Sequence, residues 1–548
     1  MNTNPKNIPA DGIAGLKQNF LADLQAGFMV FLLALPLSLG IAKASGFPNP
    51  IFGVVTAIVG GIIVSFFAGS RLTIKGPAAG LIVIVAGSVE AFGGGESGWH
   101  LALGCIVTAA IIQIMFGLLK LGNLADFFPG AAIHGMLAAI GLIIIIKQIP
   151  ILLGVAPALL KHPSEADPTK MVSYETLPLA GQIPNFISAA NAHIAIIGLI
   201  CLAIMFIFML VKHPVVKKIP GPLVVLLVAI PLAIFFHLGT DEVLGKYSLV
   251  KVGHITDILS KQFINVDFSG MGSHTGVFIQ YVILYALIGS LESLLTVKAI
   301  DGLDPYHRKS NANKDLTGLG IGNALSGIIG GLPMISEVVR SSANVGFGAK
   351  TRWANFFHGL FLLVALLVAV PVIEMIPNAA LAALLIFAGY RLASPKEFKN
   401  MLHVGVDQFV IFIITIFMTL ATDLLIGVGS GIALELLLNL FSGAKISNFF
   451  KSRSEVITSG EEVTVKVTGD ALFSNYLGLK KVIYALPKAK KVTIDLTGCH
   501  VIDHTTLHSL HGFQHDYEME GGKVVLKEHA SHTPKGKAPT STRTLKIA

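Results

Sequence analysis

The sequence predicts an α-helical polytopic membrane protein that ends in a small α/β domain. Hydrophobic residues fill 53% of the 548 positions and charged residues only 13%, which is more apolar than a soluble protein of this length. Apolar runs long enough to cross about 30 Å of hydrocarbon recur from Leu24 to Leu440. The residues that follow return to an ordinary soluble composition, so one membrane part and one soluble part are expected.

The domain organisation follows from this change in composition. The expected segments are a cytoplasmic N-terminal segment 1–23, a membrane domain 24–445, an α/β domain 455–530 and a disordered basic tail 531–548. The polar N-terminus lacks the apolar core and cleavage site of a signal peptide, which predicts a permanent first span. Lys and Arg are scattered rather than gathered, so the net charge of +8 does not indicate a nucleic-acid partner. The three cysteines have no metal or disulfide spacing.

Fourteen membrane segments are predicted, seven in each half of the chain. They are 24–45, 50–69, 77–92, 100–120, 127–147, 192–212 and 219–238, then 275–298, 316–331, 336–346, 353–374, 378–390, 405–422 and 424–443. With a cytoplasmic N-terminus, most basic residues of the short connections, among them Lys75 and Arg352, fall on the inner side. A multi-pass protein of a bacterial inner membrane with both termini in the cytoplasm is therefore expected.

Two predicted segments are interrupted at matching positions of the two halves. The third begins with Lys75-Gly76-Pro77, and the tenth follows Gly330-Gly331-Leu332-Pro333. An odd number of spans in each half makes the halves inverted repeats, whose broken helices point their N-termini at one site. Free N–H groups and the helix dipole favour an anion there. Gly and Pro that only kink packed helices are the plain alternative, and the matched positions favour transport.

Three charged residues lie within apolar surroundings. Glu292 sits in a long apolar run, where a carboxylate costs roughly 2.5–3.5 kcal/mol and needs a partner or a function. Together with Thr296, one helical turn away, it is a candidate for binding Na⁺ or a proton; a structural carboxylate paired with Lys or Arg is the alternative. Glu337 and Arg340 are three residues apart, so they either neutralise each other or act in the site.

Several motifs together resemble the SulP family of inorganic anion transporters. They are ALPLSLGIAKASG in the first segment, GSRLTIKGPAAG before the third, GSLESLLT in the eighth and GGLPMISEVVRSSANVGFGAKT around the tenth. The soluble part resembles the STAS domain of that family. The resemblance implies a seven-plus-seven inverted repeat, a homodimer, and secondary active transport of a small inorganic anion of the sulfate or bicarbonate class.

The resemblance also assigns site residues by motif. It places the anion at Leu37, Ser38, Ala78, Ala79, Val338, Val339 and Arg340, and cation coupling at Glu292, Thr296, Ser336 and Glu337. Many sulfate-type members have Gln at the position of Leu37, and sodium-coupled members typically have Asp at that of Glu292. The choices between anions and between H⁺ and Na⁺ therefore stay open, and no resident cofactor is expected.

The α/β domain shows no signal for phosphorylation or nucleotide use. Asp503 is followed by His504, where phosphorylatable STAS domains have Ser or Thr, and the chain has no Walker-type motif. His504, His508, His511 and His515 follow a helical spacing, which indicates a solvated or pH-responsive face, against the transporter or a cytoplasmic partner, more than a metal site.

Two other functions remain as alternatives to inorganic anion transport. One is a nucleobase or organic-anion symporter of the same architecture, and the other is a membrane sensor with a STAS domain that transports nothing. An enzyme is not expected, because the chain has neither a nucleophile–base pair nor an HExxH motif.

Overall fold

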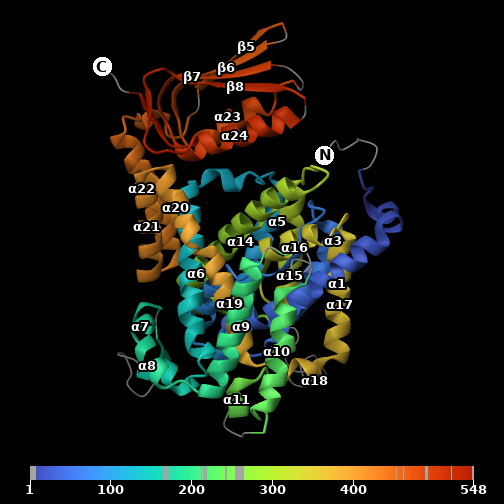
Figure 1. Ribbon diagram of the computed structural model, residues 1–548. Coiled ribbons are helices and arrows are strands. Elements are labelled where there is room, and N and C mark those ends of the chain that lie inside the picture. Colours follow the sequence, from blue (N-terminus) through green and yellow to red (C-terminus); the bar gives the residue numbers. More distant parts are fainter. Residues whose placement is uncertain are drawn as a thin grey trace. The chain divides into compact units, whose positions relative to one another are not determined.

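The computed structural model has two compact units, which are described separately (Figure 1). It describes residues 8–163, 171–174, 176–211, 213, 219–240, 244–252, 265–451, 453–460, 462–487, 491–519 and 521–545. The first unit comprises Met1–Gly122 and Gly141–Arg391, and the second comprises Asn123–Ile140 and Leu392–Ala548. The expected membrane domain 24–445 is thus divided, because its last helices group with the α/β domain.

The first unit is almost entirely helical. Its main helices are α1 (Gly12–Ala44), α2 (Ile51–Ile58), α3 (Val64–Phe67), α4 (Ile82–Ala91), α5 (Gly95–Leu118), α9 (Ala192–Leu210), α10 (Gly221–Phe235), α14 (Thr275–Leu303), α15 (Ala312–Ile328), α16 (Val338–Gly346), α17 (Trp353–Val368) and α19 (Asn378–Leu392). A π turn, Val59–Ile63, joins α2 to α3. α6 (Gly130–Leu152) begins in the second unit and ends in the first.

Short elements fill the connections of the first unit. They are β2 (Lys161–Pro163), β3 (Met171–Ser173), α7 (Thr176–Gly181), α8 (Ile183–Ser188), α11 (Leu244–Ser248), α13 (Gly270–Ser273) and α18 (Val370–Ile373). Two three-residue strands, β1 (Lys75–Pro77) and β4 (Met334–Ser336), lie inside the unit and directly precede the site described below.

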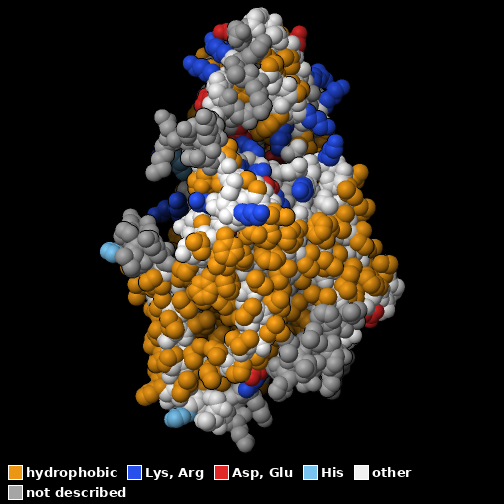
Figure 2. Space-filling model, turned by 90° about the vertical axis from the view of Figure 1, so that its right-hand side faces the viewer, with side chains coloured by type: hydrophobic (Ala, Val, Ile, Leu, Met, Phe, Trp, Pro, Cys, Tyr) orange, Lys and Arg blue, Asp and Glu red, His pale blue; other side chains and the backbone are white. Residues whose placement is uncertain are grey.

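The helices have the length and surface of a membrane protein. In the described part of the chain, six helices of 18 or more residues are apolar enough to cross a membrane, and five shorter apolar helices accompany them. Figure 2 shows a broad belt of hydrophobic side chains over this face of the helical part. Exposed side chains such as Phe235 of α10 and Val368 of α17 are costly in water and suited to lipid. The protein is therefore a multi-pass membrane protein.

The first helix is longer than its apolar run. α1 begins at Gly12, where the Asp11 carboxylate accepts the Gly12 N–H at 2.9 Å, so much of the segment 1–23 is helical rather than a simple polar extension. Asp23 within it is buried and accepts the backbone N–H groups of Lys350 (2.7 Å) and Thr351 (3.0 Å). A buried carboxylate bonded in this way fixes α1 to the start of α17, and α1 also contacts β1, α4 and α16.

The second unit combines membrane helices with the α/β domain. Its helices are α20 (Pro395–Val404), α21 (Val406–Ala421), α22 (Leu424–Phe441), α23 (Tyr476–Ile483) and α24 (His504–Met519), and its strands are β5 (Arg453–Ser459), β6 (Glu462–Ala471), β7 (Lys491–Ile502), β8 (Lys523–Lys527), β9 (His532–Pro534) and β10 (Arg543–Leu545). The strand order is β5-β6-β7-β10-β9, and β8 pairs with β7. β6, β7 and β8 are parallel, and apolar side chains such as Val465, Ile494 and Leu510 form the core between the sheet and its helices.

Three expectations for the C-terminal part were wrong. Residues 531–545 are ordered, because β9 and β10 pair with each other and β10 pairs with β7; residues 546–548 lie outside the described part. The α/β domain thus spans β5 to β10 rather than 455–530. α20 was not predicted, since its polar sequence PKEFKNMLHV has no membrane-spanning apolar run. His504 is buried and bonds Thr540 O, so the four histidines do not share a solvated face.

Candidate functional site

Two short strands in the first unit each lead into a short helix. β1 pairs antiparallel with β4, with Lys75 opposite Ser336 and Pro77 opposite Met334. α4 follows β1 and has ten residues, and α16 follows β4 and has nine. The predicted interruptions of the third and tenth segments are thereby confirmed. The backbone pairing brings two segments together that lie about half the chain apart, and both helix N-termini begin within a few residues of it.

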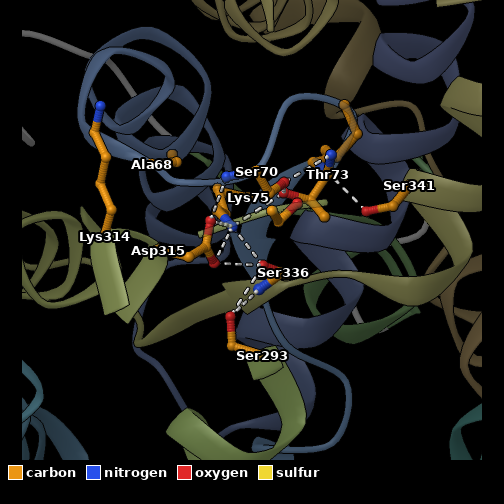
Figure 3. Close-up of polar contacts among 12 residues, drawn as sticks. Ala68, Ser70, Thr73, Lys75, Ser293, Lys314, Asp315, Ser336 and Ser341 are labelled. Carbon is orange, nitrogen blue, oxygen red and sulfur yellow. Dashed lines mark hydrogen bonds and ion pairs between the residues drawn. The ribbon is translucent and has the colours of Figure 1, made fainter. Parts of the chain in front are cut away.

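A buried ion pair anchors this strand pair (Figure 3). The Lys75 ammonium, buried completely, donates to the Asp315 carboxylate of α15 at 2.8 and 2.9 Å and to Thr73 Oγ1 at 3.0 Å. It also donates to Ser336 Oγ. The backbone N–H of Ser336 donates to Ser293 Oγ of α14 at 3.1 Å, and the Ser293 hydroxyl donates to Ser336 Oγ at 2.9 Å. Because a buried charge needs both a counter-charge and hydrogen bonds, this network holds β1, β4, α14 and α15 in one arrangement.

Lys75 and Asp315 are residues whose importance sequence reasoning missed. The sequence places Lys75 among the basic residues of the cytoplasmic connections, whereas its side chain is only 1% exposed and paired with Asp315. Asp315 lies one residue before the predicted segment 316–331. The available signal was a lysine directly before an interrupted apolar segment, together with an acid at the start of another.

Arg340, in the first turn of α16, is a buried charge without a hydrogen-bond partner in the described structure. Its side chain is fully buried, and Nε, Nη1 and Nη2 form no hydrogen bond with any described protein atom. The guanidinium lies against Gly76 of β1, where a Cβ would stand 2.6 Å from Nη1, so only glycine permits this approach. His358 of α17 is also fully buried, and both its ring nitrogens lack a partner among the described residues. A guanidinium stays charged in a protein, so burial at this place calls for an anion.

Glu292 of α14 faces the other end of the same loop. Its carboxylate lies against Gly80, where a Cβ would stand 2.2 Å from Oε1, and Oε1 is buried without a hydrogen-bond partner in the described structure. Thr296, one turn further along α14, is 1% exposed. Because Gly76 and Gly80 have no side chains, the Arg340 guanidinium lies against the first and the Glu292 carboxylate against the second. The two opposite charges thus lie at the two ends of the short stretch Gly76–Gly80.

Glu337 connects the two interrupted segments. Its backbone N–H donates to Ile74 O at 2.9 Å, and its Oε1 accepts the Ala79 N–H at 3.3 Å. The carboxylate is in electrostatic contact with Glu292 and Arg340, but it forms no hydrogen bond with the guanidinium. The sequence alternative in which Glu337 and Arg340 simply pair with each other does not describe this geometry.

The remaining predicted residues differ in their burial and surroundings. Ala78 is buried, Ala79 and Val339 are half-buried, and Val338 is 45% exposed. Ser38 of α1 is buried with an unpartnered hydroxyl, and its backbone carbonyl packs on Gly53 of α2. Leu37 packs against the apolar cluster of α9, α10 and α19.

Comparison with known proteins identifies the family of the chain. The model of the Sulfate permease family matches residues 20–415, which is most of the chain, and the protein therefore belongs to this family.

Individual relatives cover nearly the whole chain. YvdB of Bacillus subtilis is 26% identical over 93% of this chain and 91% of its own length. The bicarbonate transporter BicA of Picosynechococcus sp. is 25% identical over 81% of this chain and 74% of its own. The solved transmembrane domain of a cyanobacterial BicA superposes with a TM-score of 0.63 and 22% identity, over 76% of this chain and 97% of that one, and so shares the fold. Such relatives do not favour a nucleobase symporter, a sensor or an enzyme.

Proposed function

We propose that this protein is a secondary active transporter of a small inorganic anion, of the sulfate or bicarbonate class, in a bacterial inner membrane. The observation that carries the proposal is Arg340, a fully buried guanidinium without a hydrogen-bond partner among the described residues, in the first turn of a broken helix. The family and the name of the relative BicA support the class of substrate.

The anion is proposed to lie between the starts of α4 and α16. The first N–H groups of a helix have no partner within it, so Val338, Val339 and Arg340 offer backbone donors beside the guanidinium. Ala78 and Ala79 offer donors from the opposite segment, and Ser38 adds a free hydroxyl with Leu37 beside it on α1. This set of donors is small and lies beside the Arg340 guanidinium, which fits a compact oxyanion.

Cation coupling is proposed to involve Glu292 and Thr296, with Ser336 and Glu337 on the facing segment. Two carboxylates and one guanidinium give the site a net negative charge when all three are ionised, since Lys75 and Asp315 cancel each other. An anion enters such a site only if a cation compensates for it. A proton or a sodium ion at Glu292 supplies that compensation and links the anion to an ion gradient.

The larger architecture is also proposed from the family. It comprises fourteen membrane segments in two inverted repeats, both termini in the cytoplasm, a homodimer and a C-terminal STAS domain. The matched short helices α4 and α16, each preceded by a strand of one antiparallel pair, support the inverted repeat.

Uptake by proteoliposomes tests the function. Purified full-length protein is given labelled sulfate or labelled bicarbonate under an imposed proton gradient, an imposed sodium gradient, or neither. We expect accumulation of one of these anions driven by one gradient, and a loss of at least about tenfold in Arg340→Gln, since a hydrogen bond to a charged group is worth about 1.5–3 kcal/mol. Equal fluxes in wild type, Arg340→Gln and protein-free liposomes would reject the proposal.

A further inference from the structure

The side chain of Glu337 reaches away from the helix that it begins. It is the N-cap residue of α16, yet it makes no side-chain bond to the N–H groups of that helix. Instead its Oε1 crosses to the Ala79 N–H, 3.3 Å away, on the segment that leads into α4. The residue is only 8% exposed, so this carboxylate is held within the site rather than in solvent.

A carboxylate at this position already fills part of the place proposed for the substrate. Ala79 is one of the backbone donors facing α16, and its N–H is taken by an oxyanion that belongs to the protein. The neighbouring Arg340 guanidinium, by contrast, has no hydrogen-bond partner in the described part of the chain. An incoming oxyanion therefore finds an Arg340 guanidinium that is free to donate hydrogen bonds. It also finds that the Ala79 N–H is already bonded to the Glu337 carboxylate, which is itself an oxyanion.

We propose that Glu337 is a built-in carboxylate ligand of the anion site, which occupies the Ala79 N–H in the empty site and is displaced by the transported anion. The inference rests on the proposed function and adds a regulatory element to it. With this exchange the Ala79 N–H is bonded to Glu337 in the empty site and to the anion in the loaded site. The exchange avoids an unpaired buried N–H, which is costly. It also lowers the apparent affinity for the anion by the cost of moving Glu337 aside.

The groups around Glu337 are compatible with a side chain that moves. Glu292 of α14 repels it, Arg340 of its own helix attracts it, and the charge of Lys75 is taken by Asp315. No hydrogen bond other than that from Ala79 holds the carboxylate in the described structure. A plain cross-link between the two segments is the competing explanation, and it makes the opposite prediction for anion affinity.

Thermal stability of the full-length protein in detergent measures ligand binding directly, because a ligand that binds the folded state raises the melting temperature with its concentration. The probes are the potassium salts of sulfate, bicarbonate and formate. The variants are Glu337→Gln, which keeps the size, and Glu337→Ala, which vacates the place. Glu90→Gln, an exposed carboxylate at the far end of α4, is the matched control, and Arg340→Gln tests the site itself.

Displacement predicts that both Glu337 variants bind sulfate or bicarbonate with a half-saturating concentration at least about fivefold lower than wild type, in line with one hydrogen bond of about 1 kcal/mol. Glu337→Ala alone should also gain formate binding, since formate fits the vacated carboxylate place. Glu90→Gln should match wild type.

Unchanged or weaker anion binding in both Glu337 variants, together with no gain of formate binding, would overturn the inference. If Arg340→Gln still abolishes binding in that case, the proposed function survives. Conversely, a formate response confined to Glu337→Ala, with no response of any variant to sulfate or bicarbonate, supports the built-in ligand and contradicts the proposed substrates.

Discussion

At the scale of single residues, the candidate site contains two buried charged groups that lack hydrogen bonds within the described structure. Arg340 and Glu292 are both buried, both lie against a glycine of the segment before α4, and neither has a hydrogen bond from Nη1 or Oε1, respectively, to the described chain. Such groups are expensive in a stable fold, and the proposed anion and coupling cation would supply the missing partners.

Glu292→Gln separates coupling from anion passage. Gln keeps the size and the hydrogen-bonding ability of the side chain but binds neither a proton nor Na⁺ as a carboxylate does. We expect gradient-driven accumulation of the anion to fall to the level reached without a gradient, while exchange of anion for anion continues. The measurement is the accumulation ratio per folded protein, beside counterflow, under separate proton and sodium gradients. A wild-type accumulation ratio in this variant would remove Glu292 from the coupling mechanism.

At the scale of elements, the short strands β1 and β4 owe their position to the Lys75–Asp315 pair. Periodicity and Gly-Pro signals predict α4 and α16, because helix interruption is a local property of the chain. The ion pair could not be predicted in the same way, since its two residues are 240 positions apart and each is an ordinary charged residue at the end of an apolar run. The strands β9 and β10 could not be predicted either, because they lie in a tail of polar composition and depend on the pairing of β10 with β7.

Removing one charge of the Lys75–Asp315 ion pair should destabilise the protein more than removing both charges. Lys75→Met leaves the Asp315 carboxylate buried without its counter-charge, and we expect a loss of about 3–5 kcal/mol in stability. The double variant Lys75→Met/Asp315→Leu removes both charges and should recover much of that loss. Thermal unfolding of the full-length protein, with and without anion, makes the comparison. A double variant as unstable as the sum of the two single variants would show that the pair is not an isolated coupled unit.

Asp503 should make the α/β domain more stable in mild acid. Its carboxylate is buried and accepts the N–H of Thr506 at 2.7 Å, and burial raises the pKa of Asp503 to about 6. The folded domain therefore binds this proton more tightly than the unfolded chain, whose pKa is about 4, so stability falls as the pH rises from about 4 to 6 and is then constant with respect to this group. Asp503→Asn should flatten this part of the profile of stability against pH. The measurement is the unfolding of the C-terminal unit at each pH. A profile equally steep in this variant would assign the dependence to other groups.

At the scale of the whole molecule, the residues of the proposed anion site and the α/β domain belong to different compact units. Every predicted site residue, from Leu37 to Arg340, lies in the first unit. The second unit buries Ala444 and Phe449 of its connecting segment against Leu472 and Val501 of the α/β domain, and Leu436 of α22 packs on the same cluster. The end of the last membrane helix therefore relies on the α/β domain for part of its burial.

Removing the chain after Ala444 should lower the activity without changing the choice of anion. The truncation exposes the end of α22, so we expect less folded protein in the membrane and a lower rate of uptake. The order of preference among sulfate, bicarbonate and formate, measured by competition with the labelled substrate, should stay as in the full-length protein. A changed order would show that the second unit takes part in selection.

The pairing of β1 with β4 also sets an order of events during synthesis. Lys75 enters the nascent chain 240 residues before Asp315, its counter-charge. At about 5–20 residues per second, the ribosome needs roughly ten to fifty seconds to bridge that interval. Throughout this time the early helices must be inserted with an unpaired lysine and a strand that has no neighbour. Chains that stop before α15 therefore lack the counter-charge of this buried lysine.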